Sequence, residues 1–312
     1  MVTAIKQFND NPHLRAYICL AITAFCWGCN AIFARMAVGE VSPMLIVTLR
    51  WLGVVILMIL ITRRQLQRSW DVLRPHFSRL FLMGAFGMTA FNALFYISAY
   101  TTTALNIGII QGAIPIYVLL GGLILYGTHI SILQIVGVAM TIAGVCLVAA
   151  SGEMHRLQDV SINQGDYLMV LACLMYAGYA LSLKKLEGIP KLPLFAVICV
   201  AALIASMPLT LVEHLSGNLQ MPTAKGWLIV ALITLLPSFI AQVLFIQGVS
   251  DIGPGRAGIF VNLVPVFASL LAVLVLGESF QWFHAASLML VCSGIWLAEQ
   301  KTHLGSSSLS RN

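Results

Sequence analysis

Uncharged polar side chains recur at helical spacing inside long apolar runs of this sequence. Asn92 and Tyr96 are four residues apart, so they share one face of a helix. Ser238 and Gln242 repeat that spacing, and Gln242 follows Asn92 by 150 residues. Amide and phenol groups donate and accept hydrogen bonds, which suits them to bind a small polar solute. They could equally join helices across a bundle, and the sequence leaves both interpretations open.

The other candidates for a small-molecule site are amide and aromatic side chains in similar apolar surroundings. With Asn92, Tyr96 and Gln242, the predicted substrate-binding set comprises Trp27, Asn30, Gln111, Tyr176, Tyr179 and Asn262. Any one of these residues could be ordinary packing, but their recurrence in corresponding places favours binding for the set. Pro115 and Pro265 each remove a backbone hydrogen bond within an expected helix, which makes them candidate hinges.

Arg50 is the most informative charge, because it lies within an expected span, about two turns from its end. An arginine at the centre of a bilayer costs about 2.5–3.5 kcal/mol, and such residues usually face the interior of the bundle. Arg50 could be a counter-charge for an anionic group such as a carboxylate. It could instead be a structural tie to helix-end carbonyls or polar side chains, and we favour the tie.

Glu278 stands at the end of one expected span and just before the last. It could carry a coupling proton or cap the helix that follows it, and capping is the favoured interpretation. No acidic residue or histidine falls at the centre of an expected span. Proton coupling would therefore have no evident buried acid to use.

Signatures of enzymes and cofactors do not emerge from the sequence. The expected spans hold no two-histidine metal pair, acid pair or serine–histidine constellation, and the chain has no phosphate-binding loop that ends in Gly-Lys-Ser/Thr. Cys26 and Cys29 form a lone Cys-x-x-Cys spacing on an apolar helix, which is weak evidence for a metal or redox site. We expect a protein that is not an enzyme and has no resident metal or cofactor.

Composition indicates an integral membrane protein. The chain of 312 residues is 60% hydrophobic and only 9% charged, whereas soluble domains carry about 25% charged residues. Apolar runs of roughly 20 residues suffice to cross a bilayer as helices. We expect an all-α fold with ten transmembrane helices, at residues 16–36, 43–62, 79–99, 103–125, 131–150, 165–184, 192–212, 226–248, 254–276 and 280–298.

Basic residues cluster on one side of these spans. If the first segment is inside, the outer connections hold only Arg156 and Lys225, and the inner ones hold nearly all other lysines and arginines. This asymmetry predicts that both termini are cytoplasmic. It also accounts for the net charge of +6 without nucleic acid as a partner.

The stretch from Gly108 to Gly144 recurs as Gly258 to Gly294, at an offset of 150 residues without a gap. We expect a first five-helix repeat at 1–150, a second at 165–300 and a cytoplasmic tail at 301–312. Because five is odd, the second repeat must enter the membrane from the opposite side, which makes an inverted-topology repeat. In such proteins the substrate site lies near the midplane between the repeats, and alternating access follows from two equivalent packings.

Short motifs complete the pattern: Cys26-Trp27-Gly28-Cys29-Asn30, Thr48-Leu49-Arg50-Trp51, the two prolines within small-residue stripes, and Leu276-Gly277-Glu278. With the ten spans and the repeat, they resemble the drug/metabolite transporter superfamily, in its ten-helix EamA-like branch, from about Arg15 to Glu299. The resemblance implies a secondary carrier with a central cavity lined by helices 1, 3, 4, 6, 8 and 9. Many such carriers export amino acids or other small metabolites, often with the proton gradient as the driving force.

We therefore expect a secondary active transporter of a bacterial inner membrane, with export of a small metabolite such as an amino acid as the leading hypothesis. An importer or exchanger of another small metabolite (a nucleoside, sugar or drug) is the alternative, and an intramembrane enzyme or a channel is less favoured. The expected partners are a small-molecule substrate and the lipid bilayer, with protons as an open option. A monomer and a homodimer are both compatible with the sequence.

Overall fold

The computed structural model describes residues 12–127, 131–149, 152–153, 163–183, 186, 188–252, 260–261 and 263–299, and all regular structure within them is helical. The first half holds α2 (Pro12–Ala37), α3 (Pro43–Leu73), η1 (Arg74–His76), α4 (Phe77–Leu82), η2 (Met83–Ala90), α5 (Phe91–Ser98), α6 (Ala104–Gln111), α7 (Ile114–Tyr126) and α8 (Ile132–Ala149). The second half holds α9 (Gln164–Leu183), α10 (Lys191–Leu215), α11 (Ala224–Ile233), η5 (Thr234–Ile240), α12 (Ala241–Ile252), α14 (Leu263–Leu276) and α15 (Trp282–Glu299).

Most of these helices have the length and apolar composition of membrane spans. Six helical runs are long and apolar enough to cross a bilayer: Pro12–Ala37, Pro43–Ser98, Ala104–Tyr126, Gln164–Leu183, Lys191–Leu215 and Ala224–Ile252. Three shorter apolar helices run Ile132–Leu147, Leu263–Leu276 and Trp282–Leu297. The run from Pro43 to Ser98 takes in two of the expected spans. The chain is therefore a multi-pass helical membrane protein, and ten remains the predicted number of spans.

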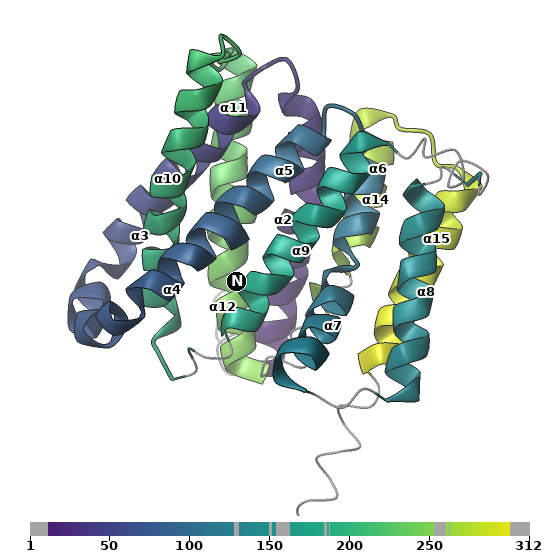
Figure 1. Ribbon diagram of the computed structural model, residues 1–312, viewed down its shortest axis with the longest axis horizontal. Helices are drawn as coiled ribbons and strands as arrows, with labels where there is room; N and C mark the ends of the chain where they lie inside the picture. Colours follow the sequence, from purple (N-terminus) through teal and green to yellow (C-terminus); the bar gives the residue numbers. More distant parts are fainter. Residues whose placement is uncertain are drawn as a thin grey trace, which may run out of the picture.

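Corresponding helices of the two repeats pack together at the edges of the bundle. Figure 1 shows α3 beside α10 at one edge and α8 beside α15 at the other. The first pair is antiparallel, because the hydroxyl of Thr48, near the start of α3, lies 2.8 Å from that of Thr210, near the end of α10. Other contacts are also related by swapping the two repeats. α2 of the first repeat packs on α12 of the second, and the corresponding α9 of the second packs on α5 of the first. An inverted repeat requires this arrangement.

Two corresponding glycines make reciprocal contacts between α8 and α15. A Cβ added to Gly144 would lie 2.9 Å from Val291 Cγ2, and one added to Gly294 would lie 2.5 Å from Thr141 Oγ1. Val291 follows Thr141 by 150 residues, as Gly294 follows Gly144. The two contacts are therefore copies of one another, and each depends on the close backbone approach that glycine permits.

The third and eighth expected spans contain π-helical segments at corresponding positions. η2 covers Met83–Ala90 and η5 covers Thr234–Ile240, and an α-helix follows each segment directly. The first of these α-helices carries Asn92 and the second carries Gln242. π-Helical turns inside longer helices often occur at functional sites. This matched distortion is not predicted by the apolar periodicity of the sequence.

The helix expected at 103–125 is interrupted just before Pro115, where it meets Pro265 of the other repeat. α6 ends at Gln111 and α7 begins at Ile114, with Pro115 in its first turn. In the gap, a Cβ added to Gly112 would lie 2.9 Å from Pro265 Cγ. The break in one repeat therefore rests against the proline of the other.

Candidate substrate site

Arg50 is at the centre of a buried polar cluster formed by α2, α3 and α5. Its Nη1 donates to Asn92 Oδ1 at 2.6 Å, to the Tyr96 hydroxyl at 2.8 Å and to Asn30 Oδ1 at 3.4 Å. The Tyr96 hydroxyl donates in turn to Asn30 Oδ1 at 3.2 Å. Asn92 is oriented by a bond from its Nδ2 to the Met88 carbonyl at 2.6 Å. Three predicted binding residues are thus joined to the predicted counter-charge.

The guanidinium group of Arg50 donates hydrogen bonds only to neutral oxygen atoms within this cluster. Arg50 is only 5% exposed, and hydrogen bonds to a charged group contribute about 1.5–3 kcal/mol each. This geometry is a tie to polar side chains. Its Nε, however, has no hydrogen-bond partner among the described residues. Buried donors without a partner are rare in folded proteins.

Trp27 links α2 to the π-helical segment of the second half. Its Nε1 donates to the Pro237 carbonyl at 3.2 Å, and its ring centre lies 5.2 Å from that of Phe245. Pro237 lies inside η5. Trp27 therefore contacts the distorted turn that precedes Gln242.

Tyr176 and Tyr179 lie side by side on α9. Their ring centres are 5.4 Å apart, and that of Tyr176 is 5.2 Å from Phe91. The half-buried Gln242 approaches the Tyr176 hydroxyl from α12. An aromatic surface of the second half thus continues from the cluster around Arg50, since Phe91 is the residue next to Asn92.

Gln111 and Asn262 complete the predicted set. Gln111 is half-buried at the end of α6, and its Oε1 has no hydrogen-bond partner in the described part of the chain. Asn262 lies outside the described residues. The structure therefore brings Asn30, Asn92 and Tyr96 into one cluster and places Tyr176 beside Gln242.

We call the end of the bundle that holds residues 38–42 the outer end, after the expected topology. There Glu278 accepts hydrogen bonds from the backbone N–H groups of Ala104 and Leu105, at 2.9 and 3.0 Å. It therefore caps α6, and the expectation that it caps the following helix is wrong. At the start of α15, His284 Nδ1 instead accepts a hydrogen bond from Gln281 N at 3.0 Å.

Glu213, at the end of α10, binds the start of α3 in a similar way. It accepts from the Ser42 hydroxyl at 2.7 Å and from the N–H groups of Met44 and Leu45 at 3.1 and 3.0 Å. Since Glu213 and Glu278 belong to the second half and the capped helices to the first, these carboxylates fasten the two halves together.

Asp166 is a buried acid that the sequence analysis does not predict. It is 1% exposed, and it accepts from the Thr102 hydroxyl at 2.5 Å and from Asn106 Nδ2 at 3.4 Å. The signal available in the sequence is an acidic residue in the first turn of an apolar helix, where the helix dipole stabilises a negative charge. Its contacts again cross from the second half to the first.

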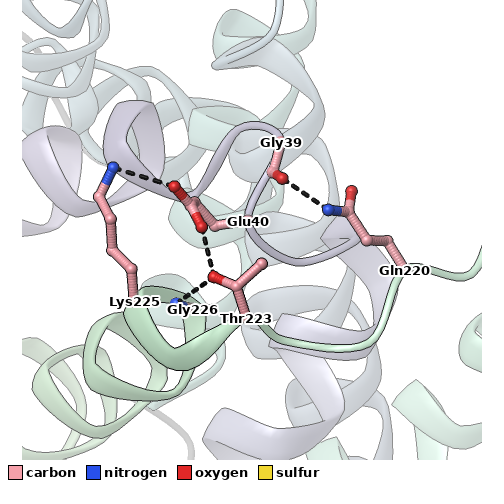
Figure 2. Close-up of polar contacts among 6 residues, drawn as sticks. All are labelled: Gly39, Glu40, Gln220, Thr223, Lys225 and Gly226. Carbon is pink, nitrogen blue, oxygen red and sulfur yellow. Dashed lines mark hydrogen bonds and ion pairs between the residues drawn. The ribbon is translucent and has the colours of Figure 1, made fainter.

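Two connections are also fastened at the outer end (Figure 2). Glu40 accepts from Lys225 Nζ at 3.0 Å and from the Thr223 hydroxyl, and Gln220 Nε2 donates to the Gly39 carbonyl at 2.5 Å. The hydrogen bond from the Thr223 hydroxyl, and to a lesser extent that from Lys225, lowers the pKa of Glu40 below its ordinary value. These contacts join the α2–α3 connection to the α10–α11 connection.

The inner end is different, because a groove of about 580 Å³ opens there between α4–η2 and α9. Tyr179 contributes to its lining, which reaches Ser182 near the inner end of α9. Elsewhere at this end, the Arg15 guanidinium and the Asp251 carboxylate form an ion pair at 2.7 Å between α2 and α12. By contrast, the void beside Trp27 has no room for a water molecule.

These features define a helical-bundle membrane protein of two repeats, with polar side chains buried where the repeats meet. A family model described as the EamA-like transporter family matches the chain twice, over residues 14–150 and 163–299. The chain belongs to this family of the drug/metabolite transporter superfamily. The resemblance expected from the motifs is confirmed.

Similar proteins agree with this assignment. The uncharacterized transporter YyaM of Bacillus subtilis is 26% identical over 92% of this chain and 94% of its own. An uncharacterized transporter of Archaeoglobus fulgidus is 25% identical over 93% of this chain and 99% of its own. A solved crystal structure has the same fold, with a TM-score of 0.64 and 18% identity over 91% of this chain and 96% of that one.

Proposed function

We propose that this protein is a secondary active transporter that exports a small metabolite, such as an amino acid or a related compound, by alternating access. The observation that carries the proposal is the matched pair of π-helical segments, because each is followed by an amide at corresponding positions of the two repeats. Asn92 and Gln242 are those amides. An inverted-repeat carrier binds its substrate between the two repeats, which alternate between two packing arrangements around the site.

The distribution of polar contacts supports one step of such a cycle. At the outer end, Glu213 and Glu278 tie the halves together. At the inner end, the Arg15–Asp251 pair holds α2 to α12 while the groove beside α9 is open. We infer a conformation closed on the outside, whose conversion would break these outer bonds. Pro115 and Pro265, at the interrupted helix contact, are the proposed hinges.

The site proposed for the substrate comprises Trp27, Asn30, Asn92, Tyr96, Gln111, Tyr176, Tyr179, Gln242 and Asn262. Arg50 would be the counter-charge, since its unpartnered Nε could meet a carboxylate. That donor favours an amino acid over a neutral nucleoside or sugar. The complete proposed topology has ten helices with both termini in the cytoplasm of a bacterium.

Transport into proteoliposomes tests this function. The purified chain would be supplied with a panel of labelled amino acids, with and without an imposed pH gradient, and compared with Gln242→Ala. The control is Gln65→Ala, because Gln65 is an exposed amide on α3. We expect saturable flux that the control keeps and Gln242→Ala loses by tenfold or more, roughly the effect of one lost binding hydrogen bond.

The same experiment separates the alternatives. Flux that does not saturate and shows no counter-transport would indicate a channel. Saturable flux of nucleosides, sugars or drugs in place of amino acids would contradict the proposed substrate class. Loss of the pH-gradient response in Asp166→Asn, with retained counter-transport, would identify Asp166 as the coupling acid.

A further inference from the structure

The groove at the inner end has a polar rim. His76, Ser78 and Arg79, at the start of α4, form one side, and Ser182, near the end of α9, forms the other. The Arg79 side chain makes no hydrogen bond or ion pair with the described residues, and none of the residues that line the groove is acidic. The Ser182 hydroxyl donates to the Gly178 carbonyl at 2.8 Å. The rim therefore presents hydroxyl groups and a positive charge that has no partner among the described residues.

From this rim the groove continues along apolar side chains. Leu82 and Phe86 on one wall are each 55% exposed, and Leu174 on the other wall is 45% exposed. In a membrane protein, exposed apolar side chains of spanning helices contact lipid tails. The groove is therefore open sideways to the bilayer, with its polar rim at the expected inner interface.

The segment that leads into the groove is strongly basic. Residues 63–79 contain five arginines and one acidic residue, Asp71. Arg63, Arg64, Arg68 and Arg74 are exposed there. Each basic residue near a membrane surface contributes about 1 kcal/mol to the attraction of anionic lipid, and basic pockets between membrane helices bind lipid headgroups.

We propose that this groove binds one anionic phospholipid of the inner leaflet. The headgroup phosphate lies at Arg79 and His76, and Ser78 donates a hydrogen bond to one of its oxygens, while the Ser182 hydroxyl keeps its bond to the Gly178 carbonyl. An acyl chain follows Leu82, Phe86 and Leu174 toward the middle of the membrane. Charge complementarity favours an anionic over a zwitterionic headgroup, and the apolar wall favours a lipid over a soluble anion.

Gly178 offers a way to block the groove without disturbing the bundle. It belongs to the lining, and a Cβ added there meets no atom within 4 Å. Phenylalanine at this position would therefore occupy the groove in place of the acyl chain. The matched control for charge is Arg74, an exposed arginine on η1 that does not line the groove.

Native mass spectrometry of the purified full chain tests the proposal, with titrations of phosphatidylglycerol, phosphatidylcholine and glycerol 3-phosphate. We expect phosphatidylglycerol to bind at least about fivefold more tightly than phosphatidylcholine, the effect of one basic residue near the surface. Arg79→Gln should remove that preference, Gly178→Phe should remove bound lipid, and Arg74→Gln should leave both unchanged. Gel filtration and thermal melts establish that each variant folds.

Three results would overturn the proposal. They are equal affinity for the two lipids, wild-type retention of phosphatidylglycerol by both Arg79→Gln and Gly178→Phe, and displacement of the lipid by glycerol 3-phosphate at equal concentration. The last would identify a site for a soluble anion. None of these outcomes depends on which metabolite the protein transports.

Discussion

Asn92→Leu tests whether the cluster around Arg50 is a structural tie. Leucine is similar in size to asparagine but removes the acceptor that lies 2.6 Å from Arg50 Nη1 and the donor to the Met88 carbonyl. The lost charge-assisted bond contributes about 1.5–3 kcal/mol, and the unsatisfied carbonyl adds to the cost, so we expect the free energy of unfolding to fall by about 3 kcal/mol. Gln242→Leu, at the corresponding half-buried position, should cost about 1 kcal/mol.

Thermal unfolding of the purified chain in detergent, followed by intrinsic fluorescence, measures both effects. At about 2–4 °C per kcal/mol for a chain of this size, Tm should fall by about 6–12 °C for Asn92→Leu and about 2–4 °C for Gln242→Leu. In an Arg50→Met background the charge is absent, so Asn92→Leu should then cost less than about 1 kcal/mol. Equal Tm losses for the two amide variants, or an unchanged Asn92→Leu effect in that background, would refute the reasoning.

Other predictions concern the contacts between the halves. Gly294→Ala places a methyl group 2.5 Å from Thr141 Oγ1 and should cost about 1–3 kcal/mol in thermal melts, because a packed interface resists added volume. Gly144→Ala should cost less, since it meets a terminal methyl group at 2.9 Å. Glu278→Gln should lower unfolding free energy by about 0.5–2 kcal/mol as the charged cap of α6 is lost, and an unchanged Tm would contradict that role. For Glu40, the folded pKa lies below the ordinary value of 4.5, so its contribution is present above pH 4.5 and disappears as pH falls through the lowered pKa. Melts between pH 7 and about 3.5 should show this loss, and Lys225→Met should diminish it.

Features set by local sequence are the ones that could be predicted. Apolar spans and the 150-residue repeat follow from composition and self-similarity, and both agree with the helices and the two family matches. The preference for Arg50 as a tie follows from the cost of a lone charge in a membrane. Its partners on α2 and α5 are consistent with that expectation, although the set of nine binding residues remains a prediction.

Features set by tertiary neighbours could not be predicted. Glu278 caps α6, which is 173 residues away along the chain, whereas sequence rules favour the helix that follows it. Asp166 is buried because Thr102 and Asn106 meet it across the halves. The π-helical segments depend on how η2 and η5 pack, and single-sequence periodicity does not distinguish them from an α-helix.

The glycine contacts between α8 and α15 have the form of an interface between two copies of one subunit. In a homodimer with two-fold symmetry, every residue near the axis acts twice, so one side chain must suit both contacts. Here the two copies are covalently joined, and each contact is encoded separately. That independence is visible where Gly294 meets the hydroxyl of Thr141 while Gly144 meets the methyl group of Val291. Duplication within one chain has thus allowed one shared interface to become two different ones.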